Sequence, residues 1–368
     1  MIKKDCRHYR GDKPCRQGYP CDDCGRYDPV ASRVLVLKCR AQGDVLRTTA
    51  LLAGLKRKYP GSLLTWLVDP ESLELVQNNP LIDRVLPLNL EGLLPLQAER
   101  FDALACLDKE PPIAALASTL RADHKFGFAL DEAGRLTTLN PAADFAWRLG
   151  MDDELKFRKN TRTYQEIAAE AIEVEYRRDD YVYNLPEGAD AKARALFRKL
   201  RVPGGRINIG LNTGAGSKFE TKQWPAGHFL KLIGLLAGTR KANLFLLGGP
   251  REKAFNAALE RKAAGKVRNT GTDNSLTEFG GFLSLMDVVV CSDTLAMHMA
   301  IGLKKRVVAL FGPTSPQEID LYDRGEKLWA GAACAPCFKQ TCDDMSCMRD
   351  ISPQSAFEAV RRQAGGRL

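Results

Sequence analysis

Residues 33–44 read RVLVLKCRAQGD, an apolar run of four residues followed by a polar loop. The uninterrupted apolar run at 34–37 predicts a strand that is buried on both faces of a sheet. A helix is predicted from Val45 to Lys58, and it ends before the Pro-Gly pair at 60–61. A strand, a polar loop and a helix in this order are typical of an α/β domain with a parallel sheet.

The same alternation of apolar runs and helical segments continues along the chain in two blocks. Predicted strands lie at 34–37, 63–68, 84–88 and 102–107 in the first block, and at 207–211, 242–247, 288–291 and 307–311 in the second. Between about 140 and 203 the pattern is helical and charged, and 184–188 (NLPEG) reads as a linker. A last helix is predicted from Pro353 to about Gln363. The chain of 368 residues is long enough for two such domains.

The chain carries a net charge of +9, from 54 Lys and Arg against 45 Asp and Glu. This favours anionic partners such as nucleotide phosphates or an acidic glycolipid, although a generally basic surface would give the same count. We see no long Lys/Arg run and no RNA-binding signature, so nucleic acid is not an expected partner. The polar N-terminus and the lack of a membrane-length apolar run predict a soluble, cytoplasmic protein whose substrate can lie at the inner face of the membrane.

Three polar or glycine-containing loops follow three of the predicted strands of the second block. In open α/β sheets, ligands bind at the carboxyl ends of the strands. The first loop, at 212–225 (NTGAGSKFETKQWP), supplies glycines, hydroxyls and two lysines before a helix, which suits a phosphate group or a plain turn equally well. In the second loop, Glu252 follows a Gly-Gly-Pro turn, and it either accepts hydrogen bonds from a nucleoside or favours the first turn of a helix.

The third loop contains Asp293, Thr294 and, one helical turn further on, His298. The N–H groups at a helix start, together with a hydroxyl and an imidazole, would suit a diphosphate. The alternative is that Asp293 or Thr294 only caps the helix and that His298 is a packed helix residue. We find no Asp-x-Asp triplet, which would hold a metal–diphosphate complex, so lysine and helix N-termini must meet the charge of such a leaving group.

Eleven cysteines are present, and eight of them form two clusters near the two ends of the chain. The first cluster is Cys6, Cys15, Cys21 and Cys24, and the second is Cys334, Cys337, Cys342 and Cys347. Four thiolates suit a structural zinc ion or, less readily, an iron–sulfur cluster, and plain reduced or disulfide-linked cysteines are the equal alternative. The other three, Cys39, Cys106 and Cys291, lie in or after apolar runs and are expected in the core.

Taken together and in order, these motifs resemble glycosyltransferase family 9, the ADP-heptose:lipopolysaccharide heptosyltransferases. The matching segments are 34–38 (VLVLK), 43–46 (GDVL) with 48–49 (TT), 79–85 (NPLIDRV), 222–225 (KQWP), 292–294 (SDT) with His298, and 311–316 (FGPTSP). The resemblance covers about residues 33–365 and implies the GT-B fold, in which two Rossmann-like domains face a cleft. It divides the chain into a cysteine-rich extension at 1–27, an acceptor domain at 28–186, a donor domain at 187–333, and a cysteine-rich loop with a final helix at 334–368 that packs back on the first domain.

The resemblance also assigns roles to individual residues. Asp44 corresponds to the general base that deprotonates the acceptor hydroxyl, while a helix N-cap is the structural alternative for this residue. The residues that fall on donor-binding positions are Thr213, Lys222, Glu252, Asp293, Thr294 and His298. Two departures are visible, since Leu295 stands where the family often has glycine and 40–42 (RAQ) replaces a serine pair. The second departure leaves the acceptor undefined.

The resemblance thus implies an inverting, metal-independent transfer of a heptose from ADP-heptose to a lipopolysaccharide core or related glycan, with no cofactor needed for the transfer. Expected partners are the nucleotide sugar, an anionic glycolipid or glycan, and the inner membrane through peripheral contact. Two alternatives stay open. A GT-B-like nucleotide-sugar epimerase would consume the donor without an acceptor, and a non-catalytic metal-binding scaffold would use only the cysteine clusters.

Overall fold

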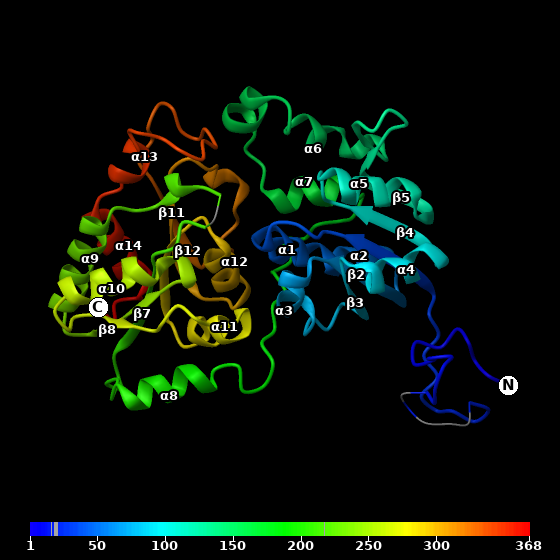
Figure 1. Ribbon diagram of the computed structural model, residues 1–368, viewed down its shortest axis with the longest axis horizontal. Helices are drawn as coiled ribbons and strands as arrows, with labels where there is room; N and C mark the ends of the chain where they lie inside the picture. Colours follow the sequence, from blue (N-terminus) through cyan, green and yellow to red (C-terminus); the bar gives the residue numbers. More distant parts are fainter. Residues whose placement is uncertain (16, 18–20, 217) are drawn as a thin grey trace. The chain divides into compact units, whose positions relative to one another are not determined.

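The computed structural model describes residues 1–15, 17, 21–216 and 218–368. The chain forms two compact units (Figure 1). The first unit comprises Met1–Met151 and Gln165–Asp179, and the second comprises Asp152–Tyr164 and Asp180–Leu368. The chain therefore passes between the units three times. Neither the predicted linker at 184–188 nor the predicted domain limits coincide with these crossing points, and the limits stay a prediction.

The first unit is built on a six-stranded sheet of order β3-β2-β1-β4-β5-β6. All neighbours are parallel except β5 and β6, which are antiparallel. Its strands are β1 (Ser32–Leu37), β2 (Ser62–Val68), β3 (Arg84–Pro87), β4 (Arg100–Cys106), β5 (Arg121–Leu130) and β6 (Leu136–Thr138). β1 lies between β2 and β4, with Val34 opposite both Leu64 and Ala103. This central position explains why its residues are apolar without alternation.

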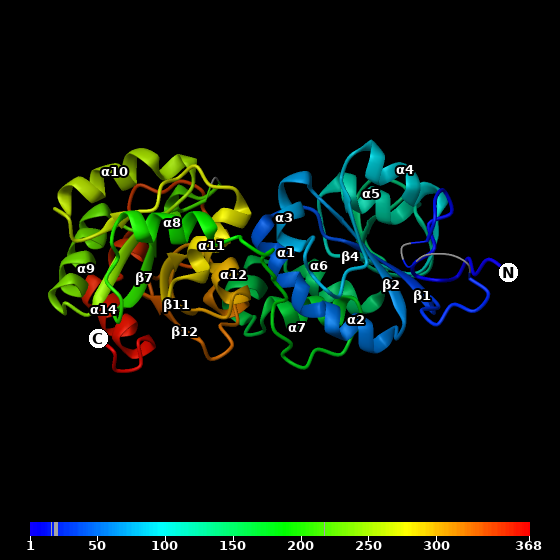
Figure 2. The same ribbon diagram turned by 90° about the horizontal axis from the view of Figure 1, so that it is seen from below.

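Helices cover both faces of the first sheet (Figure 2). They are α1 (Gln42–Thr48), α2 (Leu52–Lys58), α3 (Leu73–Val76), α4 (Leu90–Ala98), α5 (Pro111–Thr119), α6 (Asp144–Arg148) and α7 (Tyr164–Ala171). The single helix expected at 45–58 is divided, because the short 3-10 segment Thr49–Leu51 separates α1 from α2. On one face, Leu96 of α4 and Ile113 of α5 pack with the strand residues Leu35 and Leu104.

The N-terminal extension at 1–27 has no helix and no strand in its described part, and it is attached to the first sheet through Arg7. The Arg7 guanidinium donates hydrogen bonds to the carbonyl oxygens of Gly61 and Ser62, each at 3.1 Å, and it pairs with Asp28 and Asp83. One half-buried arginine side chain thus holds the extension through charge-assisted hydrogen bonds.

The second unit has a six-stranded, fully parallel sheet of order β12-β11-β10-β7-β8-β9. Its strands are β7 (Ile207–Asn212), β8 (Ala242–Leu247), β9 (Arg268–Asn269), β10 (Val288–Ser292), β11 (Arg306–Phe311) and β12 (Gly325–Trp329). Its helices are α8 (Ala191–Lys199), α9 (Ala226–Gly238), α10 (Lys253–Lys262), α11 (Leu276–Ser284), α12 (Leu295–Gly302), α13 (Ser346–Arg349) and α14 (Pro353–Gln363).

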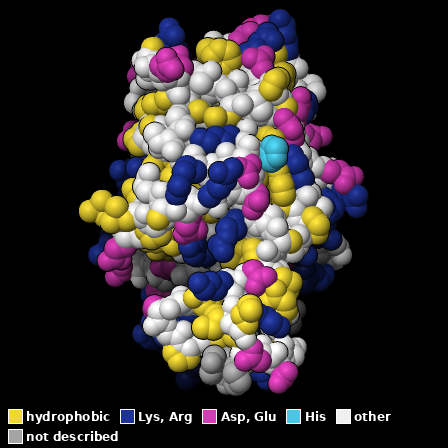
Figure 3. Space-filling model, turned by 90° about the vertical axis from the view of Figure 1, so that its right-hand side faces the viewer, with side chains coloured by type: hydrophobic (Ala, Val, Ile, Leu, Met, Phe, Trp, Pro, Cys, Tyr) yellow, Lys and Arg dark blue, Asp and Glu magenta, His cyan; other side chains and the backbone are white. Residues whose placement is uncertain are grey.

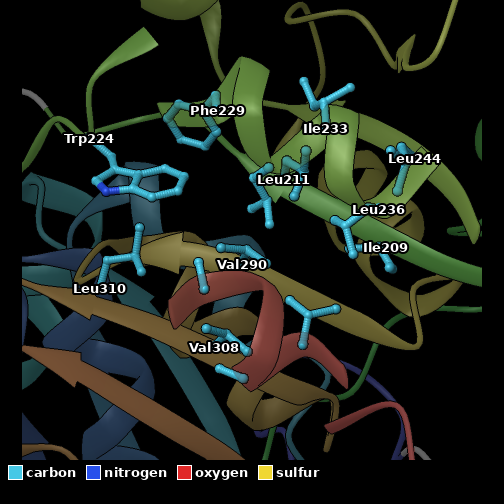
Figure 4. Packing of buried hydrophobic residues seen from close by; sticks show 14 of the residues in the cluster. Ile209, Leu211, Trp224, Phe229, Ile233, Leu236, Leu244, Val290, Val308 and Leu310 are labelled. Carbon is cyan, nitrogen blue, oxygen red and sulfur yellow. The ribbon is translucent and has the colours of Figure 1, made fainter. Parts of the chain in front are cut away.

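The core of the second unit lies between its sheet and the helices α9, α10 and α14. Figure 4 shows Trp224 and Phe229 packed beside Leu211, Val290 and Leu310, which point out of three neighbouring strands. The last helix, α14, contributes to this core and contacts α9, β10, β11 and β12. These elements all belong to the second unit. The expected packing of α14 against the first domain stays a prediction.

The expected architecture of two Rossmann-like α/β domains, the GT-B fold, is confirmed. Each predicted strand is found, and the predicted helix from Pro353 to Gln363 is α14. Among the described residues, none of the helices combines the length and the apolar composition that crossing a bilayer requires. On the face shown in Figure 3, Lys and Arg side chains gather near the middle with acidic side chains beside them. Ion pairs such as Arg84–Glu99, at 2.7 Å, neutralise part of the positive charge of the first unit.

Candidate functional site

Both sheets have the same strand order, and it reverses at one position in each. In the first sheet the chain turns to opposite sides after β1 and β4, and in the second after β7 and β10. The loops that follow such a pair of neighbouring strands leave in opposite directions, so they open a crevice at the carboxyl end of the sheet where ligands bind. In both units, a lysine that follows the first strand of this pair contacts an aspartate that follows the second.

In the first unit this contact is the buried ion pair of Lys38 and Asp108. Lys38 follows β1 and is 4% exposed, while Asp108 follows β4 and is completely buried. The Asp108 carboxylate also accepts backbone N–H bonds from Cys39 and, at 3.0 Å, from Arg40. A buried pair of opposite charges is tolerated only when its remaining hydrogen bonds are made, and these contacts make them. These bonds fix the backbone of residues 38–40, just before α1, the helix that carries Asp44.

Asp44 lies in the first turn of α1, beside two cations. Its carboxylate is 2.9 Å from the Arg47 guanidinium and 3.7 Å from the Lys38 ammonium, and its side chain is 32% exposed. The N-cap of α1 is Ala41, with a left-handed φ of 59°, so the alternative that Asp44 caps this helix is wrong. A partly exposed carboxylate that two cations hold in place can accept a proton from a hydroxyl group that reaches it.

In the second unit the corresponding contact joins Lys222 and Asp293. Lys222 follows β7 and Asp293 follows β10, and the Lys222 ammonium lies 2.8 Å from the Asp293 carbonyl oxygen and 3.1 Å from its carboxylate. A second contact joins the same two loops, because the Ser292 hydroxyl donates a hydrogen bond of 2.8 Å to the carbonyl oxygen of Lys222. The first and third loops that the sequence singled out are therefore brought together at the reversal point.

The neighbours of Asp293 lower the pKa of its carboxyl group. Burial favours the neutral carboxyl group, but attraction by Lys222 and His298 outweighs burial, so the pKa of Asp293 lies below its usual value. His298 is 5% exposed, and its Nε2 lies 3.9 Å from the Asp293 carboxylate. Its Nδ1 shares a hydrogen bond of 3.3 Å with the hydroxyl of Tyr181, whose ring stacks on the imidazole. His298 is thus both a packed helix residue and a neighbour of the charged pair.

Thr294 stands at the N-cap position of α12, which confirms one part of the alternative for this loop. Its hydroxyl donates to the carbonyl oxygen of Ser292 at 3.3 Å. The Thr294 side chain makes no capping hydrogen bond to the first turn of α12. The backbone N–H groups at this helix start, with the positive end of the helix dipole, are therefore available to an anion beside Lys222.

Thr213 and Glu252, the other two predicted donor-binding residues, make structural hydrogen bonds within the second unit. Thr213 is buried, and its hydroxyl donates to the Asn256 side-chain oxygen at 2.5 Å. The Glu252 carboxylate accepts the backbone N–H of Gly249 at 2.8 Å, as an acidic residue at a helix start does. A β-carbon placed on Gly214 would lie 3.2 Å from the Glu252 carboxyl carbon, so this glycine allows the first and second loops to touch.

The eight clustered cysteines line two separate cavities. Cys6, Cys15, Cys21 and Cys24 line one of about 20 Å³, together with His8. Cys334, Cys337, Cys342 and Cys347 line the other, of about 130 Å³. Within the described ranges, no three His, Cys, Asp or Glu side chains are arranged to hold a single metal ion. The predicted grouping of the thiols is therefore found, and the identity of a metal stays a prediction. Cys39, Cys106 and Cys291 are buried, as expected.

Several residues of these sites were not singled out from the sequence. Asp108 and Tyr181 carry no motif, and each reaches its partner only through the fold. Arg47 had a local signal, because it follows Asp44 at the i,i+3 spacing of a helix. Asp108 had one visible signal, since it is an acidic residue directly after a predicted strand. Tyr181 lies in an irregular segment 117 positions before His298, so no periodic pattern links the two residues.

Comparisons with known proteins bear on the family and the fold of the chain. The sequence profile of glycosyltransferase family 9 (heptosyltransferase) matches residues 95–347. A Campylobacter jejuni relative, lipooligosaccharide heptosyltransferase 2, is 25% identical over 200 residues, and the chain spans 62% of that relative while 50% of the chain is matched. Lipopolysaccharide heptosyltransferase 1 of Salmonella typhimurium is 24% identical over 83% of this chain and 94% of its own length.

Solved structures show the same fold. The family 9 glycosyltransferase from Veillonella parvula has a TM-score of 0.72 at 19% identity, covering 91% of this chain and 97% of that one. The E. coli heptosyltransferase WaaC with ADP-2-deoxy-2-fluoro heptose has a TM-score of 0.60 at 18% identity, covering 90% and 99%. The profile match extends from α4 of the first unit to the last clustered cysteine, and with the shared fold it leads to one conclusion: the chain belongs to glycosyltransferase family 9, the heptosyltransferase family.

Proposed function

We propose that the chain transfers a heptose from ADP-heptose to a lipopolysaccharide core or related glycan, with inversion and without a metal ion. The observation that carries this proposal is the contact of Lys222 with Asp293 at the reversal point of the second sheet, directly before the uncapped start of α12. This arrangement presents a cation and free backbone N–H groups at one place. Such a combination suits the diphosphate of a nucleotide sugar.

The donor is bound in the second unit. Lys222 and the start of α12 neutralise the diphosphate, whose negative charge grows as the bond to the sugar breaks. Asp293 holds the Lys222 ammonium in position, and His298 is a second donor to the phosphate or sugar oxygens. Glu252, beside Gly214, accepts from the nucleoside, and Thr213 shapes the same loop. The heptosyltransferase names of the Campylobacter and Salmonella relatives, and the ADP-heptose analogue in WaaC, support ADP-heptose as this donor.

The acceptor reacts at Asp44 in the first unit. Asp44 takes the proton of an acceptor hydroxyl, and the hydroxyl oxygen then attacks the anomeric carbon on the side opposite the diphosphate. The bond from this carbon to the diphosphate oxygen breaks, and ADP leaves with the electron pair. Lys38 and Arg47 hold the carboxylate in position, and Lys38 is also paired with Asp108. The Asp44 side chain is still 32% exposed, so an acceptor hydroxyl can reach it. A single displacement of this kind inverts the anomeric centre.

The transfer needs no cofactor, and its setting is the cytoplasm at the inner face of the membrane. A net charge of +9 suits an anionic glycolipid acceptor and peripheral contact with an anionic membrane. The small cavity lined by Cys6, Cys15, Cys21 and Cys24 suits a structural zinc ion, because tetrahedral thiolate zinc is compact. These cysteines then stabilise the extension without entering the reaction.

The test combines ligand binding with product analysis. Thermal shift of the full chain with ADP, UDP and GDP should give a clear shift for ADP and much smaller shifts for the other two. Incubation of ADP-heptose with a heptose-deficient lipopolysaccharide core should then release ADP and give a product with inverted anomeric configuration. Donor consumption without any acceptor would instead identify an epimerase. An absent ADP shift in protein that is folded would reject the nucleotide-sugar proposal altogether.

A further inference from the structure

The second cysteine cluster surrounds one cavity that is too large for a single ion. Cys334, Cys337, Cys342 and Cys347 all line this space of about 130 Å³, whereas one water-sized sphere takes roughly 10–15 Å³ on the same scale. A single tetrahedral zinc ion draws four sulfur atoms to about 2.3 Å. The described thiols do not converge in that way. In a cubane iron–sulfur cluster, by contrast, each cysteine binds a different iron atom, so the sulfur atoms stand apart around a shared volume.

The four thiols around this cavity differ in their exposure. Cys347 is buried, Cys337 is half-buried, and Cys334 and Cys342 are exposed. Gly312 allows the close packing, because a β-carbon there would lie 3.1 Å from the Cys347 sulfur. The chain therefore brings the fourth thiol against the backbone that follows β11.

The cysteine loop is joined to the Lys222 loop by two contacts. The Thr221 hydroxyl donates to the carbonyl oxygen of Lys339 at 2.7 Å. The Phe338 ring stands edge-on against Phe219, with the ring centres 6.0 Å apart, and the Lys222 ammonium lies 5.0 Å from the centre of the Phe219 ring. A displacement of residues 337–339 would therefore move the segment that carries Lys222.

The same loop is joined to the end of β11 and to residues before α7. The backbone N–H groups of Cys337 and Phe338 both donate to the carbonyl oxygen of Pro313, each at 2.9 Å. On its other side, Phe338 stacks on Phe157 with ring centres 5.2 Å apart, and the Arg158 guanidinium donates to the carbonyl oxygen of Ala335 at 3.0 Å. The loop has few buried apolar side chains of its own, so these contacts depend on what holds the cysteines together.

We propose that Cys334, Cys337, Cys342 and Cys347 bind an iron–sulfur cluster, and that the bound cluster holds the 219–222 segment so that Lys222 meets the donor diphosphate. The first part stands on the cavity and its four thiol ligands alone. The second part rests on the proposed function, because it assumes that Lys222 binds a nucleotide sugar. The cysteines are positioning residues for the transfer, since they act through Phe338 and Thr221 and do not contact the donor loop's ammonium.

The test uses the full chain purified without oxygen, in four forms. The first is the natural sequence, the second is Cys334→Ser/Cys337→Ser/Cys342→Ser, and the matched control is Cys15→Ser/Cys21→Ser/Cys24→Ser in the first cluster. Cys347 is kept because it is buried, and the single exposed substitution Cys342→Ser guards against misfolding of the triple variant. Iron, acid-labile sulfide and zinc are measured per chain, visible absorption is recorded, and far-UV circular dichroism checks the fold.

The natural chain and the first-cluster control should each contain about four iron and four sulfide per chain and absorb visible light. The second-cluster variants should lose most of this iron and sulfide. Three results would overturn the proposed iron–sulfur cluster. They are a natural chain that contains zinc but no sulfide, a natural chain that contains no metal, and equal iron contents in the two triple variants. For the second part, the Cys342→Ser variant should lose most of the ADP thermal shift that the control keeps. An unchanged shift would overturn the coupling, and no ADP shift in the cluster-loaded natural chain would instead reject the proposed function.

Discussion

The Lys222 ammonium contacts both the carbonyl oxygen and the carboxylate of Asp293, at 2.8 and 3.1 Å, across 71 positions of sequence. Each residue follows one of the two strands between which the second sheet reverses, which is where ligands bind in open α/β sheets. Lys38 and Asp108 occupy the corresponding places in the first unit. Two sheets of the same order thus place a Lys–Asp pair at the same point, and only the first pair is fully buried.

The Lys222–Asp293 contact leads to the first prediction. Lys222→Met should lower kcat/KM for the donor by roughly 100-fold or more, because removing one preorganised charge partner of the transition state has an effect of this size. Lys218→Met is the matched control, since Lys218 lies in the same loop but is exposed. Steady-state kinetics and ADP binding by calorimetry measure the effect. Equal losses in the two variants would mean that Lys222 acts only through general loop charge.

Asp44 gives the second prediction. Asp44→Asn should lower transfer by about 1,000-fold while ADP binding is kept, because the amide cannot accept the acceptor proton but fills the same space. Initial rates of ADP release and an ADP thermal shift measure the two effects. Asp131→Asn, in an exposed turn of the same unit, serves as the control. Normal turnover by the purified Asp44→Asn variant would remove Asp44 from the mechanism.

The central strands could be predicted from the sequence because strands buried on both faces are continuously apolar, as Val34–Leu37 of β1 are. β5 could not be predicted in the same way. Its first half, from Arg121 to Lys125, is partly exposed and charged, and only the part from Phe126 onward is buried. At the edge of the second sheet, β12 is likewise polar. Such strands take their conformation from pairing with a neighbour rather than from their own pattern.

In the candidate site, too, some features could be predicted from the sequence and others could not. Lys222, Asp293 and His298 could be selected one by one, because each belongs to a short motif after a predicted strand. Their mutual contacts could not be predicted from spacing, since they depend on which strands are neighbours in the sheet. The same holds for Tyr181 beside His298, where an irregular segment supplies the hydrogen-bond partner. Sequence motifs thus identified the chemistry, while the strand order determined the pairs.

Thr213 provides the third prediction, which separates a structural role from a donor-binding role. Thr213→Val should lower the free energy of unfolding by about 1–3 kcal/mol, because the buried Asn256 side chain loses its hydroxyl partner. Thr213→Ser keeps the hydroxyl and should remain close to the natural chain. Urea denaturation measures the stability, and ADP thermal shift measures binding. If Thr213→Val kept its stability but lost ADP binding, the hydroxyl would belong to the donor site instead.

The fourth prediction concerns Arg57 and Asp179, which hold α2 to the end of the 165–179 segment. The guanidinium makes two hydrogen bonds, of 3.0 and 2.7 Å, to the two carboxylate oxygens. This hydrogen bonding lowers the pKa of Asp179 in the folded chain below its ordinary value of 3.8. The pair should contribute about 1 kcal/mol, since it is bidentate but partly exposed.

Because the pKa of Asp179 is lowered by folding, this contribution is complete above pH 3.8 and is lost as the pH falls through the lower pKa of the folded chain. Asp179→Asn should therefore be less stable than the natural chain at pH 7, and the difference should shrink toward zero in acid. Urea denaturation of both proteins between pH 7 and 3 measures it, with the exposed Asp153→Asn as control. A difference that stays constant over this range would show that the carboxylate charge is not what stabilises the contact.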